Sequence, residues 1–152
     1  MRFALAVLIA LVLAPAAAAW TPISKSPLQN IDRPAVLRTS AGTELVTWDD
    51  NGSGLWLWSS KTGTRQIETV PFVNQPQIVQ QPSGAIQIYA GGGAGVDRFQ
   101  STDDGATWSG PFAIVSPTSV GPVVSATVRR DGTPMFTQDS TFGINVFQGL
   151  NG

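Results

Sequence analysis

The feature that most limits the fold of this chain is a repeat that runs through most of the sequence. Three segments each contain a strand led by proline, a turn with glycine and a second strand, and the leading prolines are Pro34, Pro76 and Pro122. These prolines are 42 and then 46 residues apart, close to the ~40–50 residues of one propeller blade. We therefore predict an all-β fold, an incomplete β-propeller of four-stranded antiparallel blades that holds about two and a half blades.

The repeats align strand by strand. The second strands align from Leu45, Ile86 and Met135. The third strands are expected at residues 55–58, 96–99 and 144–147, and fourth strands at 65–70 and 110–115. We predict no helix after residue 19.

A closed propeller has about four to eight blades, and each blade buries its faces against its neighbours. The sequence stops at Gly152, between the expected third and fourth strands of the third repeat. We expect a truncated reading frame or a fragment of a longer propeller. Assembly of several copies into a ring is the second interpretation. A partial propeller that stands alone is the third, and it would expose edge strands that are prone to pairing.

A turn with a distinctive composition follows the third strand of the second repeat. It reads Ser-Thr-Asp-Asp-Gly-Ala-Thr-Trp over residues 101–108. Gly105 can adopt a positive φ at little steric cost, and nearby Asp or Ser side chains can accept hydrogen bonds from main-chain N–H groups. Thr107 and Trp108 are suited to restart a strand. The segment is therefore expected to close a hairpin.

This segment resembles the Asp-box, or BNR repeat, of the sialidase superfamily, which is written S-x-D-x-G-x-T-W. All five defined positions match, at Ser101, Asp103, Gly105, Thr107 and Trp108. The resemblance implies a propeller and a structural role for these five residues, because the box is a turn that enzymes and non-enzymes share. The first repeat carries a degenerate box with Lys61 at the Asp position.

The resemblance implies catalysis by an arginine triad, a tyrosine paired with glutamate, and an aspartate, but few of these groups can be placed on this chain. Arg33 is the candidate ligand-binding arginine, although it adjoins Pro34 and Asp32 occupies the arginine position of the family's motif. Tyr89 is the only tyrosine, and it lies on an expected second strand rather than late in the ring. We predict no catalytic residue in this chain.

Three tryptophans gather in the first repeat. Trp56 and Trp58 share one face of their strand, while Leu55 and Leu57 share the other. The tryptophan rings, with Trp48 nearby, are candidates for stacking on a sugar ring. Packing between blades is the alternative interpretation of the same face.

Composition indicates an exported chain. Residues 1–19 have the charged start, the apolar core and the small-residue cleavage site of a secretory signal, so residues 20–152 form the expected propeller domain, secreted or periplasmic, with no membrane span. After Arg2 is removed, eight basic and ten acidic residues remain, which argues against nucleic-acid binding. Cysteine and histidine are absent. Ser-His-Asp and Cys-His catalysis are therefore excluded, and we predict no metal and no cofactor.

Two functions follow from these patterns. The first is a secreted Asp-box propeller module or fragment that is non-catalytic alone and binds carbohydrate or protein. The alternative is a fragment of a sialidase-like exo-glycosidase that lacks most catalytic residues.

Overall fold

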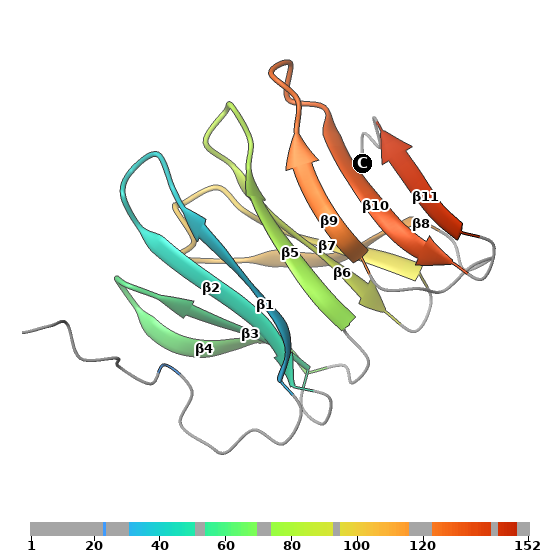
Figure 1. Ribbon diagram of the computed structural model, residues 1–152. Coiled ribbons are helices and arrows are strands. Elements are labelled where there is room, and N and C mark those ends of the chain that lie inside the picture. The colour runs from blue at the N-terminus through green and yellow to red at the C-terminus, as the bar shows by residue number, and fades with distance from the viewer. Residues whose placement is uncertain are drawn as a thin grey trace, which may run out of the picture.

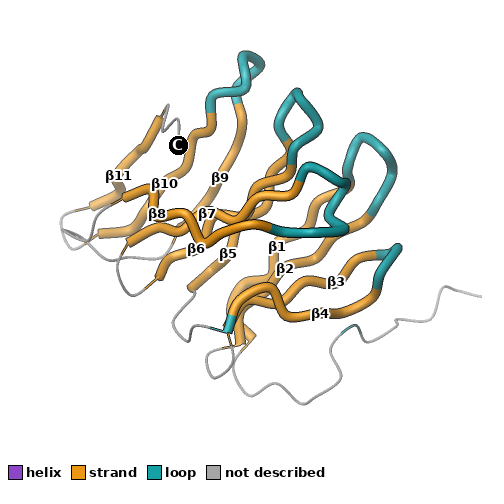
Figure 2. The backbone as a smooth tube through the Cα atoms, turned by 180° about the vertical axis from the view of Figure 1, so that it is seen from behind, coloured by secondary structure: helices purple, strands orange, loops and turns teal. Residues whose placement is uncertain are grey.

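Three antiparallel β-sheets stand side by side in the computed structural model (Figure 1). The structure describes residue 23 and residues 31–50, 54–69, 74–92, 95–115, 123–140 and 143–148. Every regular element in these ranges is a strand, as the tube view also shows (Figure 2). The predicted all-β fold, an incomplete β-propeller, is confirmed.

Each sheet corresponds to one sequence repeat, and its strands are hydrogen-bonded in chain order. The first sheet contains β1 (Ile31–Arg38), β2 (Glu44–Asp50), β3 (Gly54–Ser59) and β4 (Gly63–Glu68). The second contains β5 (Asn74–Gln80), β6 (Ile86–Gly92), β7 (Gly95–Ser101) and β8 (Ser109–Val115). The described part of the third contains β9 (Val123–Val128), β10 (Pro134–Ser140) and β11 (Gly143–Gln148).

The hairpins between first and second strands fix how the repeats correspond. Backbone hydrogen bonds close them from Thr39 to Thr43, from Gln81 to Ala85 and from Arg129 to Thr133. Counting from these turns, Leu45 and Met135 correspond to Gln87. The expected match of Leu45 with Ile86 is therefore wrong by one residue, and such a shift moves a side chain to the opposite face of the sheet.

Apolar faces pack each sheet on the next. Leu45, Leu55 and Leu57 of the first sheet meet Ile88 and Phe99 of the second, and all five are almost fully buried. The opposite face of the second sheet packs on the third through a second buried cluster, formed by Val79, Tyr89, Val96 and Phe136. The innermost strands β1, β5 and β9 contact one another in that order. The middle sheet is consequently buried on both faces.

Leu57 tests the packing of the first sheet on the second. It is fully buried, so Leu57→Ala should lower the free energy of unfolding by about 2–5 kcal/mol, measured by urea denaturation. Val36 on β1 is 71% exposed, and Val36→Ala is the matched control. It should change the free energy by less than about 0.5 kcal/mol. Equal effects of the two substitutions would contradict this account of the core.

Candidate functional site

The first sheet carries a tryptophan face, which we define as Trp48, Trp56 and Trp58. Trp48 of β2 lies directly opposite Trp56 of β3, and their rings stack with centroids 6.5 Å apart and planes 11° from parallel. Since the leucines that alternate with them face the second sheet, the tryptophans lie on the face turned away from it.

Exposure differs within this face. Trp48 is only 3% exposed, whereas Trp56 and Trp58 are half-buried. Trp48 is therefore the buried member of the tryptophan face, and the rings of Trp56 and Trp58 keep surface that a ligand can contact. The indole Nε1 of Trp48 is buried without a hydrogen-bond partner among the described residues.

β4, which pairs with β3, places uncharged polar groups beside the tryptophan face. Thr64 lies opposite Trp58, and Gln66 lies opposite Trp56. The Thr64 hydroxyl donates a hydrogen bond of 2.6 Å to the carbonyl oxygen of Ile23, which places Ile23 next to this face. Aromatic rings bordered by hydroxyl and amide groups are a chemistry suited to a neutral polar ligand.

Arg33, the other candidate ligand-binding residue, lies in β1. Its side chain is outside the part of the chain that the structure describes, so its role stays a prediction. The expected signal segment, residues 1–19, also lies outside the described residues, so it stays a prediction.

The turn at residues 101–108 is held by its own side chains. The Ser101 hydroxyl donates to Asp103 Oδ1 at 2.8 Å and accepts from the Gly105 N–H at 2.9 Å. Asp103 also accepts from the N–H and the hydroxyl of Thr107, at 2.8 and 2.6 Å. Trp108 Nε1 donates to the Gly105 carbonyl at 3.2 Å. Both carboxylate oxygens of Asp103 are thus engaged within the turn, as a structural residue requires.

The same turn also fastens the second sheet to the first, a role that sequence reasoning missed. Asp104 Oδ2 accepts from Lys61 Nζ at 2.6 Å and from the Thr43 hydroxyl. Arg65 donates to the Ala106 carbonyl at 2.6 Å and to the Gly105 carbonyl. Lys61 of the first repeat therefore supplies a cation to the neighbouring turn.

An acidic pair lies between the first two sheets. Glu68 ends β4, opposite Leu55, and Asp97 lies opposite Ala90 in the second sheet. Burial raises the pKa of Asp97, and the negative charge of Glu68 raises it further. No local sequence signal joins residues of β4 and β7, so the pairing was not foreseen.

Tyr89 is almost fully buried and donates a 2.5 Å hydrogen bond to Gln87 Oε1. Burial raises the pKa of its hydroxyl to about 12, against a smaller lowering by Arg98. Such a hydroxyl stays protonated and closed to substrate, which argues against a role as nucleophile.

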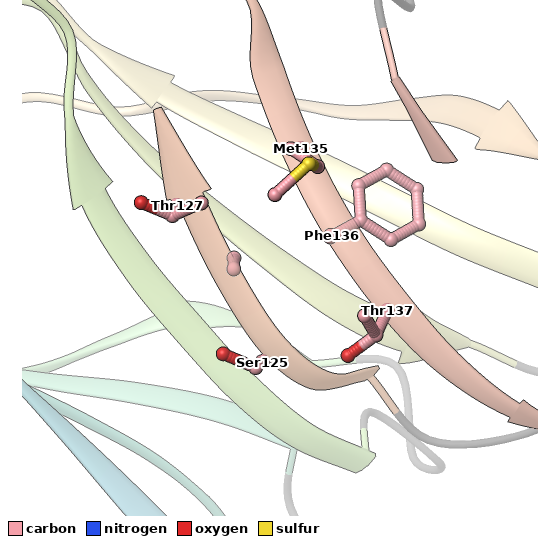
Figure 3. Close-up of a pocket in the computed structure, with 6 residues that line it drawn as sticks. Ser125, Thr127, Met135, Phe136 and Thr137 are labelled. Carbon is pink, nitrogen blue, oxygen red and sulfur yellow. The ribbon is translucent and has the colours of Figure 1, made fainter. Parts of the chain in front are cut away.

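A small hollow opens on the third sheet (Figure 3). Its volume is about 40 Å³, and its lining includes Met135, Phe136 and Thr137. A few water molecules fill that volume, so a sugar ring does not fit.

Among the described residues, no group of three or more Asp, Glu, His or Cys side chains is placed to hold a metal ion. The described residues also contain no helix of the length and apolarity that a membrane span needs.

Three solved structures share this fold. A protein of unknown function from Dyadobacter fermentans is 15% identical, with a TM-score of 0.55, over 78% of this chain and 50% of its own. An α-L-arabinofuranosidase from Fusarium graminearum, in complex with an iminosugar inhibitor, is 15% identical with a TM-score of 0.56, over 84% and 46%. An α-L-arabinanase from Penicillium chrysogenum, complexed with arabinobiose, is 15% identical with a TM-score of 0.55, over 84% and 47%.

This chain spans about half the length of each of these proteins. At this level of identity the likeness shows the fold, and the fold defines the class: an incomplete β-propeller. No protein-family model matches the sequence, and no curated protein matches it.

The hydrogen bonds of Asp103 predict how stability depends on pH. Thr107, with a smaller contribution from Ser101, holds the pKa of Asp103 at about 2, below the usual 3.8. A lowered carboxylate pKa stabilises the fold above about pH 4, and this contribution is lost as pH falls towards about 2. Asp103→Ala should cost about 1–3 kcal/mol at pH 7 by loss of these bonds. The difference from the unsubstituted chain should shrink between pH 4 and pH 2 in urea denaturation.

Thr107→Val is the matched control for Asp103→Ala, because it removes one hydroxyl donor and keeps the carboxylate. It should destabilise less than Asp103→Ala. A pH-independent difference for Asp103→Ala would contradict the ionised, hydrogen-bonded turn.

Asp97 should change the stability of the fold with pH in the direction opposite to Asp103. A raised carboxylate pKa means that the fold loses stability as pH rises from the ordinary value through the raised one. Asp97→Asn should therefore raise the thermal midpoint at pH 7 in calorimetry, with a smaller gain at pH 3. Asp131 is the control, because hydrogen bonds from Thr133 lower its pKa. Its substitution should therefore shift the thermal midpoint in the opposite direction. Asp131→Asn should lower the midpoint at pH 7, and a shared direction would contradict both assignments.

Proposed function

We propose that this chain is an exported, non-catalytic carbohydrate-binding propeller module that uses the tryptophan face. The single observation that carries the proposal is the pair of half-buried rings, Trp56 and Trp58, on the face turned away from the second sheet. A flat indole presents an apolar surface to the C–H face of a sugar ring. The adjacent Thr64 and Gln66 supply groups that can hydrogen-bond to sugar hydroxyls.

The fold likeness supports the choice of carbohydrate over protein as the ligand. Two of the similar structures are enzymes named for arabinose-containing substrates, one complexed with arabinobiose and the other with an iminosugar inhibitor. We also infer that the turn at residues 101–108 is an Asp-box of the sialidase type, supported by its five matching positions and by the hydrogen bonds of Ser101 and Asp103. In this role the turn positions the blades and leaves binding to the tryptophans.

A fragment of an exo-glycosidase is the second candidate, and the acidic pair favours it. A partly buried carboxyl group with a raised pKa, as at Asp97, is a property of general acids. Hydrolysis of an aryl arabinofuranoside or an aryl sialoside by the purified chain, abolished by Asp97→Asn, would favour this candidate over the binding module.

The binding proposal is tested by titrating the chain with arabinobiose and with a panel of neutral oligosaccharides, followed by tryptophan fluorescence. Trp56→Ala and Trp58→Ala should each weaken binding of the responding sugar about tenfold, since an aromatic stacking contact contributes about 0.5–1.5 kcal/mol beyond the area it buries. Phe112, an aromatic residue on the second sheet that is 44% exposed, is the control. Phe112→Ala should leave affinity unchanged.

Two outcomes would contradict the binding proposal. One is the absence of any fluorescence response or retained ligand across the panel. The other is an equal loss of affinity in Phe112→Ala and in the tryptophan variants, which would show that the tryptophan face is not the site.

A further inference from the structure

The interface between the first two sheets is held by polar groups at the end that carries the 101–108 turn. There Asp104 accepts from Lys61 Nζ at 2.6 Å and from the Thr43 hydroxyl. Arg65 donates to two carbonyl oxygens of the same turn. We call this the turn end of the interface. Each of these contacts joins a donor of the first sheet to an acceptor of the second.

The other end of this interface carries carboxyl groups on the first sheet. Leu55 of β3 lies opposite Asp49 of β2 and opposite Glu68 of β4. Leu55 is fully buried in the core between the two sheets, and residues directly opposite one another on neighbouring strands share a face. Asp49 and Glu68 therefore lie on the face that meets the second sheet.

The second sheet adds a carboxyl group at the same end, which we call the carboxyl end. Asp97 of β7 lies opposite Ala90 of β6, and Ala90 is buried in the core between the first two sheets. Asp97 therefore faces the first sheet. The negative charge of Glu68 adds to the effect of burial in raising the pKa of Asp97, so the two carboxyl groups lie within electrostatic reach of each other.

No described cation faces Asp97 to offset this charge. The neighbouring strands β6 and β8 contain no charged residue. Arg98 lies on the opposite face of β7, with its guanidinium over the Phe112 ring. Arg65 of the first sheet is bound to the turn end. The described charged groups at the carboxyl end are therefore all acidic.

We propose that the interface between the first two sheets responds to pH at one end: the carboxyl end opens locally when Glu68 and Asp97 are both ionised and closes when Asp97 takes up a proton. Protonation of Asp97 removes the repulsion between two like charges and supplies an O–H donor. Glu68, whose Oε1 accepts a 2.7 Å hydrogen bond from the Thr69 N–H, is held at the end of β4. The turn end stays closed throughout.

The direction of the pH dependence follows from Asp97. Because its pKa is raised above the ordinary 3.8 in the closed interface, the closed form binds the proton more tightly than the open form. Opening of the carboxyl end should therefore increase as pH rises from 3.8 through the raised pKa and then stay level. Asp103 and Asp104, with pKa values of about 2, stay ionised over this range, so the turn end should not change.

Amide hydrogen exchange, followed by NMR from about pH 4 to about pH 7.5, measures local opening residue by residue. After correction for the intrinsic rate of each amide, exchange in residues 54–56, 66–68 and 96–98 should rise about two- to fivefold with pH. This is the range expected for like charges that face each other across strands. Exchange in residues 101–107, at the turn end, should not rise.

Charge-removing variants identify the groups responsible. Asp97→Asn and Glu68→Gln should each abolish the rise in exchange at the carboxyl end. The double variant should behave like either single variant, because the two substitutions remove the same repulsion. Glu44→Gln is the matched control, since Glu44 is an exposed carboxylate near the turn end of the same sheet. It should keep the full rise.

Three results would overturn the proposal. One is a level exchange profile in the unsubstituted chain, and another is a rise that persists in either single variant. The third is an equal rise in residues 101–107, which would show that the whole interface opens. If one single variant does not fold, the other decides by itself. The assay contains no sugar, so its result is independent of the proposed carbohydrate function.

Discussion

The packing of one sheet's apolar face on the next is the interaction on which the rest of this structure depends. Each sheet is a meander whose strands follow in chain order, so hydrogen bonding alone would give three separate ribbons. Leu57 on one side and Phe99 on the other are buried only because the first two sheets meet. That contact decides which face of the first sheet is left over, and the leftover face is the one that carries Trp56 and Trp58. The candidate site is thus a product of inter-sheet packing.

The strands could be predicted from the sequence because the repeat supplies three copies of the same pattern. Proline-led strands and glycine turns recur at one blade's spacing, and β3, β7 and β11 fall on the expected third strands. The register of the middle repeat could not be predicted. Its sheet is buried on both faces, so apolar residues occur at both phases of the alternation, and hydrophobicity does not reveal which face Ile86 takes. The turn hydrogen bond of Gln81 settles it.

The candidate site, like the strands, could be predicted from the sequence only in part. The shared face of Trp56 and Trp58 follows from alternation along one strand, and the local hydrogen bonds of Asp103 follow from turn chemistry within eight residues. Contacts between sheets have no such signal. Lys61 and Asp104 are 43 residues apart, and Arg65 and Gly105 are 40 apart. Only the stacking of blades, roughly one repeat period apart, brings these partners together.

The two cationic contacts of the 101–108 turn differ in how they respond to dissolved ions. Lys61 is 58% exposed where it meets Asp104, so concentrated salt, which shortens the screening length to about 3 Å at 1 M, weakens this attraction. Arg65 donates instead to the carbonyl oxygens of Gly105 and Ala106, which are neutral dipoles. In concentrated salt the Lys61–Asp104 ion pair weakens, while the hydrogen bonds of Arg65 remain. Through Arg65 the two sheets therefore keep a contact at this turn that depends little on ionic strength.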